Sequence, residues 1–463
     1  MKLLRDNIHG DISISPLSDR VIKHPLFQRL RFISQTGFLY LIYPGMRHSR
    51  FEHSIGACHL ADRFLNALPH SSGILDNLDP VEDHLLIEES KDLIKTILRD
   101  ERWKDIFRLA ALLHDLGHGP FSHTFEQLDL LKPEHVDFAK VGNEAIKKFL
   151  QAKTRLKHED MSLYFLDQIL SPEKDTVNDT LWVACLIHSE FRESICRQNQ
   201  SGHKDSQEAK IVLLLSPMIS GLVDVDRLDY VVRDAKMAGV PYGQIEVARI
   251  IDHTVPVLLK DHSLHEGALL VRAKYSPTID HFLFNLFEMY PHIYYHQAAI
   301  RMAHEFKQTI EISRRLPGLI CENWYKNASD HSLLNDVEPE VSRLISDVFS
   351  RRCKSSQRVA IQLLKPSDGL INDLKEKNWI QIEAGKRNLL KGKDKVFLKV
   401  DTGDKNSEIV PWSSYSILQE ETYKPQIWWH NPGFTEALES VRRSLESNRK
   451  TKKDKLTKVD QAG

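Results

Sequence analysis

The stretch ALLHDLGHGPFSH, residues 111–123, joins the end of an apolar helix to a dense group of polar side chains. The apolar run Ile106 to Leu113 predicts a buried helix, and the glycines and proline from Gly117 onward are typical of a helix end. His114 and Asp115 stand at that end, where an imidazole and a carboxylate can reach one cation while the backbone turns away. Two ligands do not make a metal site, so other segments must supply more donors.

A second helical pattern opens at RHSRFEHSIG, residues 47–56, and is apolar at helical spacing from Phe51 to Leu68. It carries His53, a third nitrogen donor, with Arg50 about one helical turn before it. A single histidine on an apolar helix is more often a core residue than a ligand. His53 therefore gains meaning only together with the other donors.

A third segment, DVDRLDYVVRD at residues 224–234, supplies carboxylates. Asp226, Asp229, Tyr230 and Arg233 fall at positions i, i+3, i+4 and i+7, which places them on one helical face. Two acids, a phenol and a guanidinium make that face too polar for an ordinary core. This face and the histidines together are the candidate site.

The composition is that of an ordinary globular protein, with 41% hydrophobic and 27% charged residues among 463. Lys and Arg total 63 against 64 acids, so no overall field draws the chain to nucleic acid or to an anionic membrane. No apolar segment is long enough to span a bilayer and no secretory leader is evident, which favours a cytoplasmic protein. The five cysteines form no CxxC pair, which argues against disulfides and thiolate zinc sites.

We expect a mainly α protein with a small α+β C-terminal subdomain. Residues 1–350 are expected to form the helical core, residues 351–445 the α+β subdomain, and residues 446–463 a basic, disordered tail. In the subdomain, KVFLKV and SEIVPWSSYSI cluster β-formers between glycine-containing turns. In the core, Leu222–Arg233 and Phe282–Phe306 are further predicted helices, and residues 71–90 are predicted to form a surface excursion.

The order of His53, then His114 with Asp115, then Asp226 resembles that of the HD-domain metal-dependent phosphohydrolases. Six motifs also follow the order seen in the HD-domain deoxynucleoside triphosphate (dNTP) triphosphohydrolases, in the branch that contains the vertebrate sterile-alpha-motif and HD-domain enzyme and its bacterial relatives. These motifs are DNIHGDISIS at Asp6, FQRLRFISQTG at Phe27, RHSRFEHSIG at Arg47, LLHDLGHGPFSH at Leu112, KHED at Lys157 and DVDRLDY at Asp224. The likeness is strongest over residues 5–305 and implies an HD-domain helical core.

The resemblance implies that one divalent metal is held by His53, His114, Asp115 and Asp226. Mixed histidine and carboxylate ligation suits Mn, Fe, Zn or Mg, and the sequence does not distinguish them. The resemblance places Arg50 against the substrate phosphates, where the free N–H groups of a helix start also favour an anion. The implied reaction cleaves between the deoxyribose 5′ oxygen and the α-phosphorus and releases a deoxynucleoside and inorganic triphosphate.

The resemblance also places His118, His123 and His158 on the phosphate side of the pocket. A histidine beside an acid can act as general acid for the leaving 5′ oxygen because its pKa lies near neutrality. We expect this role for His158 and His123. Glu126 and Glu159 are expected to orient their rings.

Further substrate contacts implied by the resemblance surround the sugar and the phosphates. A dNTP site must reject a 2′ hydroxyl, and an aromatic ring packed against C2′ does so sterically. The segment MYPHIYYHQ offers Tyr290, Tyr294 and Tyr295 for this role, while the small residues Ala298 and Ala299 lie near the position of the family's own gate. The expected substrate-binding residues are Gln35, Arg50, Arg227, Tyr230, Asp234 and Tyr294.

An activating nucleotide is expected to contact Gln28 and Arg31, which match a segment that faces activator phosphates in relatives. Lys23 stands where the vertebrate relative has an acid that reads guanine, and a lysine cannot accept hydrogen bonds from guanine. Activation specific for guanine is therefore not expected. The relatives also imply a homotetramer.

Two other function classes stay open. Another HD hydrolase, such as a nuclease or a cyclic-nucleotide phosphodiesterase, would leave triphosphates intact. A nucleotide sensor would keep the fold without turnover, although four intact metal-capable residues argue against it. The near-neutral charge and the lack of a basic stripe interleaved with aromatics count against a nucleic-acid binder, while the lysines of the tail leave that class open.

Overall fold

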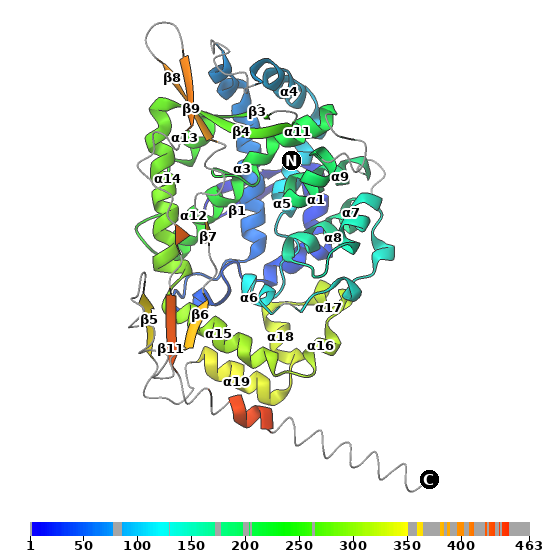
Figure 1. Cartoon of the computed structure of the whole chain (residues 1–463), viewed down its shortest axis with the longest axis vertical. Coiled ribbons are helices and arrows are strands. Elements are labelled where there is room, and N and C mark those ends of the chain that lie inside the picture. The colour runs from blue at the N-terminus through cyan, green and yellow to red at the C-terminus, as the bar shows by residue number, and fades with distance from the viewer. Residues whose placement is uncertain are drawn as a thin grey trace.

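The computed structural model (Figure 1) describes residues 2–76, 86–128, 130–171, 177–197, 203, 206–261 and 264–350. Beyond residue 350 it describes strands at 359–363, 380–383, 387–388, 396–401, 407–411, 422–423 and 426–430, and residues 435 and 438–443. The predicted tail at 446–463 lies outside this part of the chain. The described chain is mainly α, which confirms the predicted fold class.

The α-helices are α1 (Pro16–Lys23), α2 (Pro25–Gln28), α3 (Arg50–Ser71), α4 (Ile87–Arg99), α5 (Glu101–Leu113), α6 (His123–Glu126), α7 (Glu144–Gln151), α8 (His158–Leu170), α9 (Val177–Ile187), α10 (Ser189–Arg192), α11 (Gln207–Leu215), α12 (Val225–Ala238), α13 (Val247–Asp252), α14 (Ser276–Met289), α15 (Gln297–Glu311), α16 (Leu316–Leu319), α17 (Glu322–Asn327), α18 (Asp330–Asp336) and α19 (Pro339–Phe349).

The short 3₁₀ segments are η1 (Arg29–Phe32), η2 (Gly37–Leu41), η3 (Ser72–Leu75), η4 (Pro133–His135), η5 (Phe138–Lys140), η7 (Ser216–Met218) and η8 (Ala273–Tyr275), and the π segments are η6 (Glu193–Arg197) and η9 (Tyr290–Tyr294). The strands are β1 (Lys2–Asp6), β2 (Gly10–Ile14), β3 (Thr254–Asp261), β4 (Leu264–Arg272), β5 (Val359–Leu363), β6 (Ile380–Glu383), β7 (Arg387–Asn388), β8 (Val396–Asp401), β9 (Ser407–Pro411), β10 (Thr422–Tyr423) and β11 (Gln426–His430).

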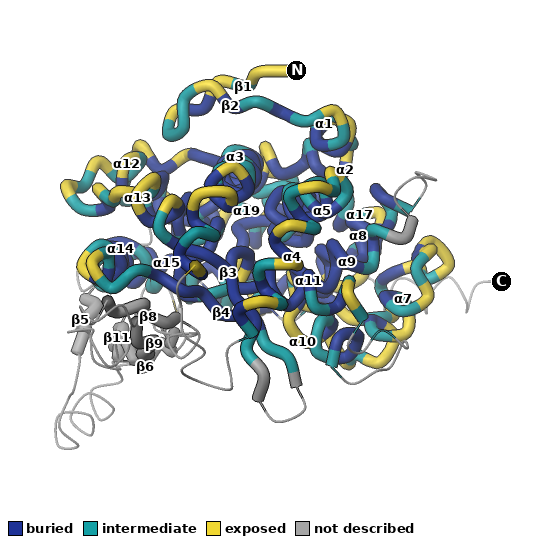
Figure 2. Tube along the Cα trace, turned by 90° about the horizontal axis from the view of Figure 1, so that it is seen from above, coloured by how far each residue is buried: buried dark blue, intermediate teal, exposed yellow. Residues whose placement is uncertain are grey.

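Helix α3 runs through the middle of the molecule and packs against α5 and α12; Figure 2 shows it largely buried. Its start is fixed by a capping box, in which the Glu52 carboxylate accepts the backbone N–H of Ser49 at 2.6 Å. The helix predicted over Phe51–Leu68 is confirmed and is one residue longer at its start. Gly56 lets α12 approach closely, because a Cβ there would lie 2.0 Å from a carboxylate oxygen of Asp229.

His114 and Asp115, the HD pair, directly follow the C-terminal end of helix α5. The Asp100 side chain caps its first turn by accepting the backbone N–H of Arg102 at 2.9 Å. The following turn passes so close to the start of α8 that a Cβ on Gly117 would lie 2.0 Å from the carbonyl oxygen of His158. The turn thereby brings the HD pair close to His158.

The prediction of one helix over Phe282–Phe306 is wrong, because the structure has α14 and α15 separated by the π turn η9. Pro291 lies in this turn, and it has no N–H with which to continue the α-helical hydrogen-bond ladder. The break places Tyr290, Tyr294 and Tyr295 on the wall of a cavity.

Four strands form a sheet in the order β3-β4-β8-β9. The antiparallel hairpin β3–β4, in which Thr254 pairs with Val271, was not predicted. The segments KVFLKV and SEIVP form β8 and β9 as predicted, and β8 pairs in parallel with β4. Strands from beyond residue 350 therefore extend a sheet that begins in the helical part of the chain.

A second unpredicted hairpin, β1–β2, lies at the N-terminal end. The predicted surface excursion is only partly described: η3 and the start of α4 are helical, and residues 77–85 lie outside the described residues. None of the described helices combines the length and apolar character needed to cross a bilayer.

Candidate active site

A cavity of about 1000 Å³ lies between α3, the turn that begins at His114 and Asp115, α12 and α15. Its volume is at the upper end of the roughly 300–1,000 Å³ typical of small-molecule sites. The predicted site residues on its wall are Gln35, Arg50, His114, Asp115, His118, His123, Glu126, His158, Glu159, Asp226, Tyr230, Asp234, Tyr290, Tyr294 and Tyr295.

The four residues predicted to bind a metal converge beside this cavity. The Nε2 atom of fully buried His53 lies 3.0 Å from Asp226 Oδ1, 3.2 Å from His114 Nε2 and 3.5 Å from Asp115 Oδ2. Ligand atoms that share one ion at about 2.1 Å lie roughly 3.0–3.5 Å from one another. The spacing of these donors therefore fits one divalent cation, and His53, His114, Asp115 and Asp226 form a candidate metal centre.

The outer nitrogen of each histidine ring is already used. His114 Nδ1 lies 2.8 Å from the carbonyl oxygen of Ala111, which can only accept, so Nδ1 carries the proton. His53 Nδ1 likewise donates to Asp229 Oδ2 at 2.8 Å. Both Nε2 atoms then point toward the shared place, and each would bind a cation there once deprotonated, as in metal-binding histidines.

The charge around His53 also suits a cation. Burial alone would lower the pKa of this ring, but the carboxylates of Asp226 and Asp229 outweigh it and raise the pKa to about 10. A strong negative field therefore acts on the place where the Nε2 atoms meet. A divalent cation bound there would neutralise this field.

Asp229 was noted on the polar face of α12 but was given no role, and the structure shows that it supports His53. It is fully buried and accepts hydrogen bonds from Arg233 Nε at 2.8 Å and from His9 at 2.7 Å. Arg233 Nη1 in turn donates to Asp6 Oδ2 at 2.9 Å. A chain of buried charges therefore runs from the N-terminal hairpin to the metal centre.

Arg50, the first residue of α3, donates to three acceptors. Its Nη1 reaches Asp115 Oδ2 at 2.5 Å, its Nε reaches Ser122 Oγ at 3.0 Å, and its Nη2 reaches the carbonyl oxygen of Gln35 at 3.2 Å. Burial would raise the pKa of Asp115, but the Arg50 charge helps to hold it well below its usual range. Arg50 thus joins the metal centre to the cavity wall.

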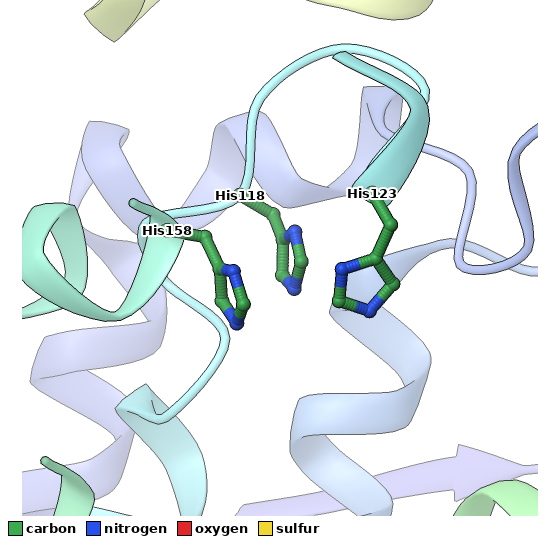
Figure 3. Close-up of side chains that lie close together, drawn as sticks. All are labelled: His118, His123 and His158. Carbon is green, nitrogen blue, oxygen red and sulfur yellow. The ribbon is translucent and has the colours of Figure 1, made fainter. Parts of the chain in front are cut away.

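The three histidines expected on the phosphate side form a second cluster, shown in Figure 3. One carboxylate serves two of them: Glu126 lies 3.0 Å from His158 Nδ1 and 3.2 Å from His123 Nδ1. Burial would raise the pKa of Glu126, but these two hydrogen bonds lower it, so the carboxylate is ionised and both Nδ1 atoms carry protons. Nε2 is then the acceptor nitrogen of each ring when the ring is neutral.

His118 differs from the other two rings. It is buried, and burial together with the charge of Arg50 holds its pKa well below the usual range, so it is neutral. Its Nε2 lies 3.3 Å from Asp115 Oδ1, and its Nδ1 has no hydrogen-bond partner among the described residues. His118 therefore lies between the metal centre and the histidine cluster.

The histidine cluster does not suit a second ion as it stands. An ion bound by an imidazole nitrogen lies in the plane of that ring. The rings of His118 and His158 are stacked, with centroids 4.0 Å apart and an interplanar angle of 12°, so no nearby point lies in both planes. Side-by-side nitrogens instead suit adjacent oxygens of a phosphoryl group.

The sugar-side candidates lie on another part of the wall. Tyr294 donates to Asp234 Oδ2 at 2.7 Å, while His48 holds Asp234 Oδ1 at 2.6 Å. Burial and the charge of Asp234 raise the pKa of Tyr294, so its phenol stays protonated. Gln35 Oε1 is buried and has no hydrogen-bond partner in the described chain, so it is available to a ligand hydroxyl.

Three predicted binding residues do not line the cavity. Arg227 follows Asp226 on α12, and its Nη1 lies 3.4 Å from the carbonyl oxygen of Leu222. Gln28 and Arg31 contact each other at 2.9 Å on the outside of the protein, and the Arg31 guanidinium lies 3.5 Å above the Phe51 ring. The expected effector residues are thus together but separate from the cavity.

A profile of the HD domain matches residues 50–234. Deoxynucleoside triphosphate triphosphohydrolase SAMHD1 of Homo sapiens is 31% identical over 258 residues, which are 52% of this chain and 34% of that protein. The SAMHD1 homolog of Dictyostelium discoideum is 25% identical over 430 residues, which are 90% of this chain and 64% of that protein. The chain therefore spans less than two thirds of the length of these relatives.

Among solved structures, a phosphohydrolase from Bacteroides thetaiotaomicron shares the fold with a TM-score of 0.61 at 20% identity, over 93% of this chain and 99% of that one. The HD-domain match includes all four residues of the metal centre. Residues 50–234 therefore match the HD domain, and the chain is similar in sequence to proteins named as deoxynucleoside triphosphate triphosphohydrolases.

Proposed function

We propose that this protein hydrolyses dNTPs to deoxynucleosides and inorganic triphosphate in a metal-dependent reaction. The observation that carries the proposal is the placement of two chemically different groups on one cavity wall. Asp115 belongs to the metal centre and also contacts His118 of the histidine cluster, so it joins the two groups. The same carboxylate accepts a hydrogen bond from Arg50. The relatives named as dNTP triphosphohydrolases support the same reaction.

The metal would be held by His53, His114, Asp115 and Asp226, and when bound it would polarise a phosphate oxygen and favour ionisation of an attacking water. Arg50 would bind the phosphates as a bidentate donor, for which its planar guanidinium is suited. The Arg50 guanidinium would thus add positive charge beside the place of the cation, where a triphosphate carries its negative charge.

The proton for the leaving 5′ oxygen would come from the histidine cluster. The Glu126 carboxylate binds Nδ1 of both His158 and His123, so Nε2 of each ring would be the atom that acts on the leaving oxygen. His158 is the better candidate, because its side chain is 16% exposed whereas that of His123 is 46% exposed. Neutral His118 would stay a hydrogen-bonding partner.

The sugar would lie toward Tyr294, Asp234 and Gln35. The acceptor oxygens of Gln35 and Asp234 suit the 3′ hydroxyl, and one of the tyrosine rings near Tyr294, packed against C2′, would exclude a 2′ hydroxyl. The small residue Ala299 of α15 also lines the cavity, beside the tyrosines of η9.

The assembly and regulation of this enzyme belong to the same proposal. A homotetramer in the cytoplasm, with an activating nucleotide bound near Gln28 and Arg31, would agree with the motifs of the N-terminal segment. Arg227 would contribute to phosphate binding only after a change of its side-chain conformation, because it does not line the cavity as it stands.

The deciding experiment incubates the purified protein with each dNTP singly and in pairs, with and without Mn²⁺, and separates inorganic triphosphate from pyrophosphate. Release of triphosphate with the deoxynucleoside is expected. Release of pyrophosphate would identify a different phosphohydrolase, cleavage of a cyclic nucleotide or a single strand would favour the alternative HD hydrolases, and nucleotide binding without turnover would identify a sensor.

A further inference from the structure

Asp330 lies at the start of α18, outside the range matched by the HD domain, yet its carboxylate reaches the cavity wall. Its Oδ1 accepts the backbone N–H of Phe121 at 2.5 Å, and its Oδ2 accepts the backbone N–H of Ser34 at 2.9 Å. One side chain therefore ties together two segments that are distant in sequence.

One of these segments is in a disfavoured conformation. Phe121 and Ser122 have φ angles of 54° and 52°, and they are the non-glycine residues with positive φ in the described part of the chain. Side chains other than glycine rarely adopt this region, and such residues persist only when their surroundings hold them. The Phe121 ring packs against Phe38 at 4.7 Å, and Asp330 holds the Phe121 N–H.

The residues that follow the two anchored N–H groups are contacts of Arg50. Ser122 comes directly after Phe121, accepts Arg50 Nε at 3.0 Å and donates to the Ser34 carbonyl at 2.6 Å. Gln35 comes directly after Ser34, and its carbonyl oxygen accepts Arg50 Nη2 at 3.2 Å. Two of the three acceptors of Arg50 thus depend on backbone that Asp330 fixes.

The carboxylate of Asp330 is not needed by its own helix. Ser329 is the N-cap of α18, and its Oγ accepts the Ser332 N–H at 3.1 Å. Burial raises the pKa of Asp330 to about 6, and the two backbone hydrogen bonds and the Arg50 charge only partly offset it. Burying this carboxylate costs free energy, and its helix is already capped by Ser329. The two backbone hydrogen bonds to other segments are therefore the contacts that the side chain serves.

We propose that Asp330 is a positioning residue for anion binding, which fixes the strained turn and the Ser34–Gln35 backbone so that Arg50 is aimed at the phosphates. This inference rests on the proposed function, because it assigns the phosphates to Arg50. It also gives the helices after the HD-domain match a part in the site.

The test measures the affinity of the protein, with its metal as purified, for inorganic tripolyphosphate by calorimetry, beside KM and kcat for a dNTP. Asp330→Ala should weaken tripolyphosphate binding about 10-fold or more, and Asp330→Asn, which keeps one acceptor oxygen, should weaken it less. KM should rise by more than kcat falls, because Arg50 holds the phosphates before and during the reaction.

Asp336→Asn is the matched control, because Asp336 lies on the same helix and accepts Trp324 Nε1 at 2.7 Å away from the cavity. It should lower the melting temperature without changing tripolyphosphate affinity. Equal losses of affinity in this control and in Asp330→Asn would overturn the inference, and so would wild-type affinity in either Asp330 variant. If Asp330→Ala fails to fold, Asp330→Asn decides. An unchanged protein that neither binds tripolyphosphate nor hydrolyses dNTPs would contradict the proposed function and this inference with it.

Discussion

The metal centre and the histidine cluster are built from the same residue types, but they are arranged for different tasks. At the metal centre, the outer nitrogens of His53 and His114 bind separate acceptors and their inner nitrogens converge within 3.2 Å. In the cluster, His123 and His158 share the single acceptor Glu126, and His158 stacks on His118. Nitrogens that converge beside carboxylates suit a cation, whereas the stacked rings of His118 and His158 suit the oxygens of an anion.

The comparison teaches that a group of histidines does not identify a metal site by itself. What distinguishes the two groups is the acceptor on the far side of each ring and the angle between the rings. The negative charge also differs, because Asp115 and Asp226 both lie against His53 Nε2 in the metal centre, whereas His123 and His158 share the carboxylate of Glu126, which binds their Nδ1 atoms. Substitutions in the two groups should therefore cause different losses of bound metal and of turnover.

The largest loss is expected for Asp115→Ala. A site that loses one of two charged ligands binds its metal too weakly to keep it, so bound metal and turnover should fall together, to roughly a tenth or less of the unchanged protein. Metal content by mass spectrometry and dNTP turnover check this. Asp105→Ala on α5, the helix that precedes Asp115, is the control and should keep both, because Asp105 pairs with Arg108 at 3.0 Å. Full metal occupancy in Asp115→Ala would remove Asp115 from the metal centre.

A change in the histidine cluster should lower turnover without lowering metal content. His158→Ala removes the proposed proton donor, so kcat should fall by about 10²–10⁴ fold. Metal content and affinity for a non-hydrolysable dNTP should stay within a few fold. His70→Ala, at an exposed position near the end of α3, controls for the loss of a histidine elsewhere. A parallel loss of metal would show that the cluster belongs to the metal centre, and the contrast between the two groups would fail.

A smaller loss of metal affinity is expected when Asp229, which binds the outer nitrogen of His53, is changed. Asp229→Asn removes the charge behind His53, and such changes cost about 10- to 100-fold in metal affinity or activity. Asp6→Asn is a matched comparison, because Asp6 also binds Arg233 but does not touch His53. Both variants should melt at lower temperature, since each loosens a buried arginine. Only Asp229→Asn should lose metal, as measured by titration of the metal-free protein; equal metal affinity in the two variants would assign Asp229 a purely structural role.

The sequence predicts most of the metal centre because its residues lie in short motifs on strongly apolar helices. His114 and Asp115 are adjacent, and His53 lies on a helix whose spacing is clear, so only the distance between the segments needed the structure. Asp229 was visible on the same face of α12 as Asp226, but its bond to His53 depends on how closely α3 and α12 approach at Gly56. The roles of these residues stay predictions.

Other features depend on tertiary contacts that local patterns do not contain. Asp330 follows an ordinary capping serine, and its hydrogen bonds to Phe121 and Ser34 join segments more than 200 residues away. Arg227 was expected among the phosphates, but successive residues on a helix point about 100° apart, so it does not share the cavity-facing side of Asp226. The hairpin β3–β4 was missed because short apolar runs fit a strand and a helix equally well. The domain limits at residues 350 and 445 stay predictions.

The smallest effect is expected at the N-terminal segment, which belongs to neither group. Lys23 is 65% exposed and pairs with Asp19 at 2.5 Å, near Gln28 and Arg31. An ammonium facing the N1–H and N2–H₂ groups of guanine leaves donors against donors, and each unpaired buried donor costs about 1–3 kcal/mol. This cost lowers effector affinity by roughly tenfold or more.

Titration of GTP against hydrolysis of a non-guanine dNTP should therefore show no stimulation of the unchanged protein, while another nucleotide or no activator at all would agree with this segment. Lys23→Asp restores an acceptor at this place and is the informative variant, because a gain of GTP response in it would show that the segment still forms a nucleotide site. Strong stimulation of the unchanged protein by micromolar GTP would show that Lys23 does not face the base, and the basis for excluding guanine would be lost.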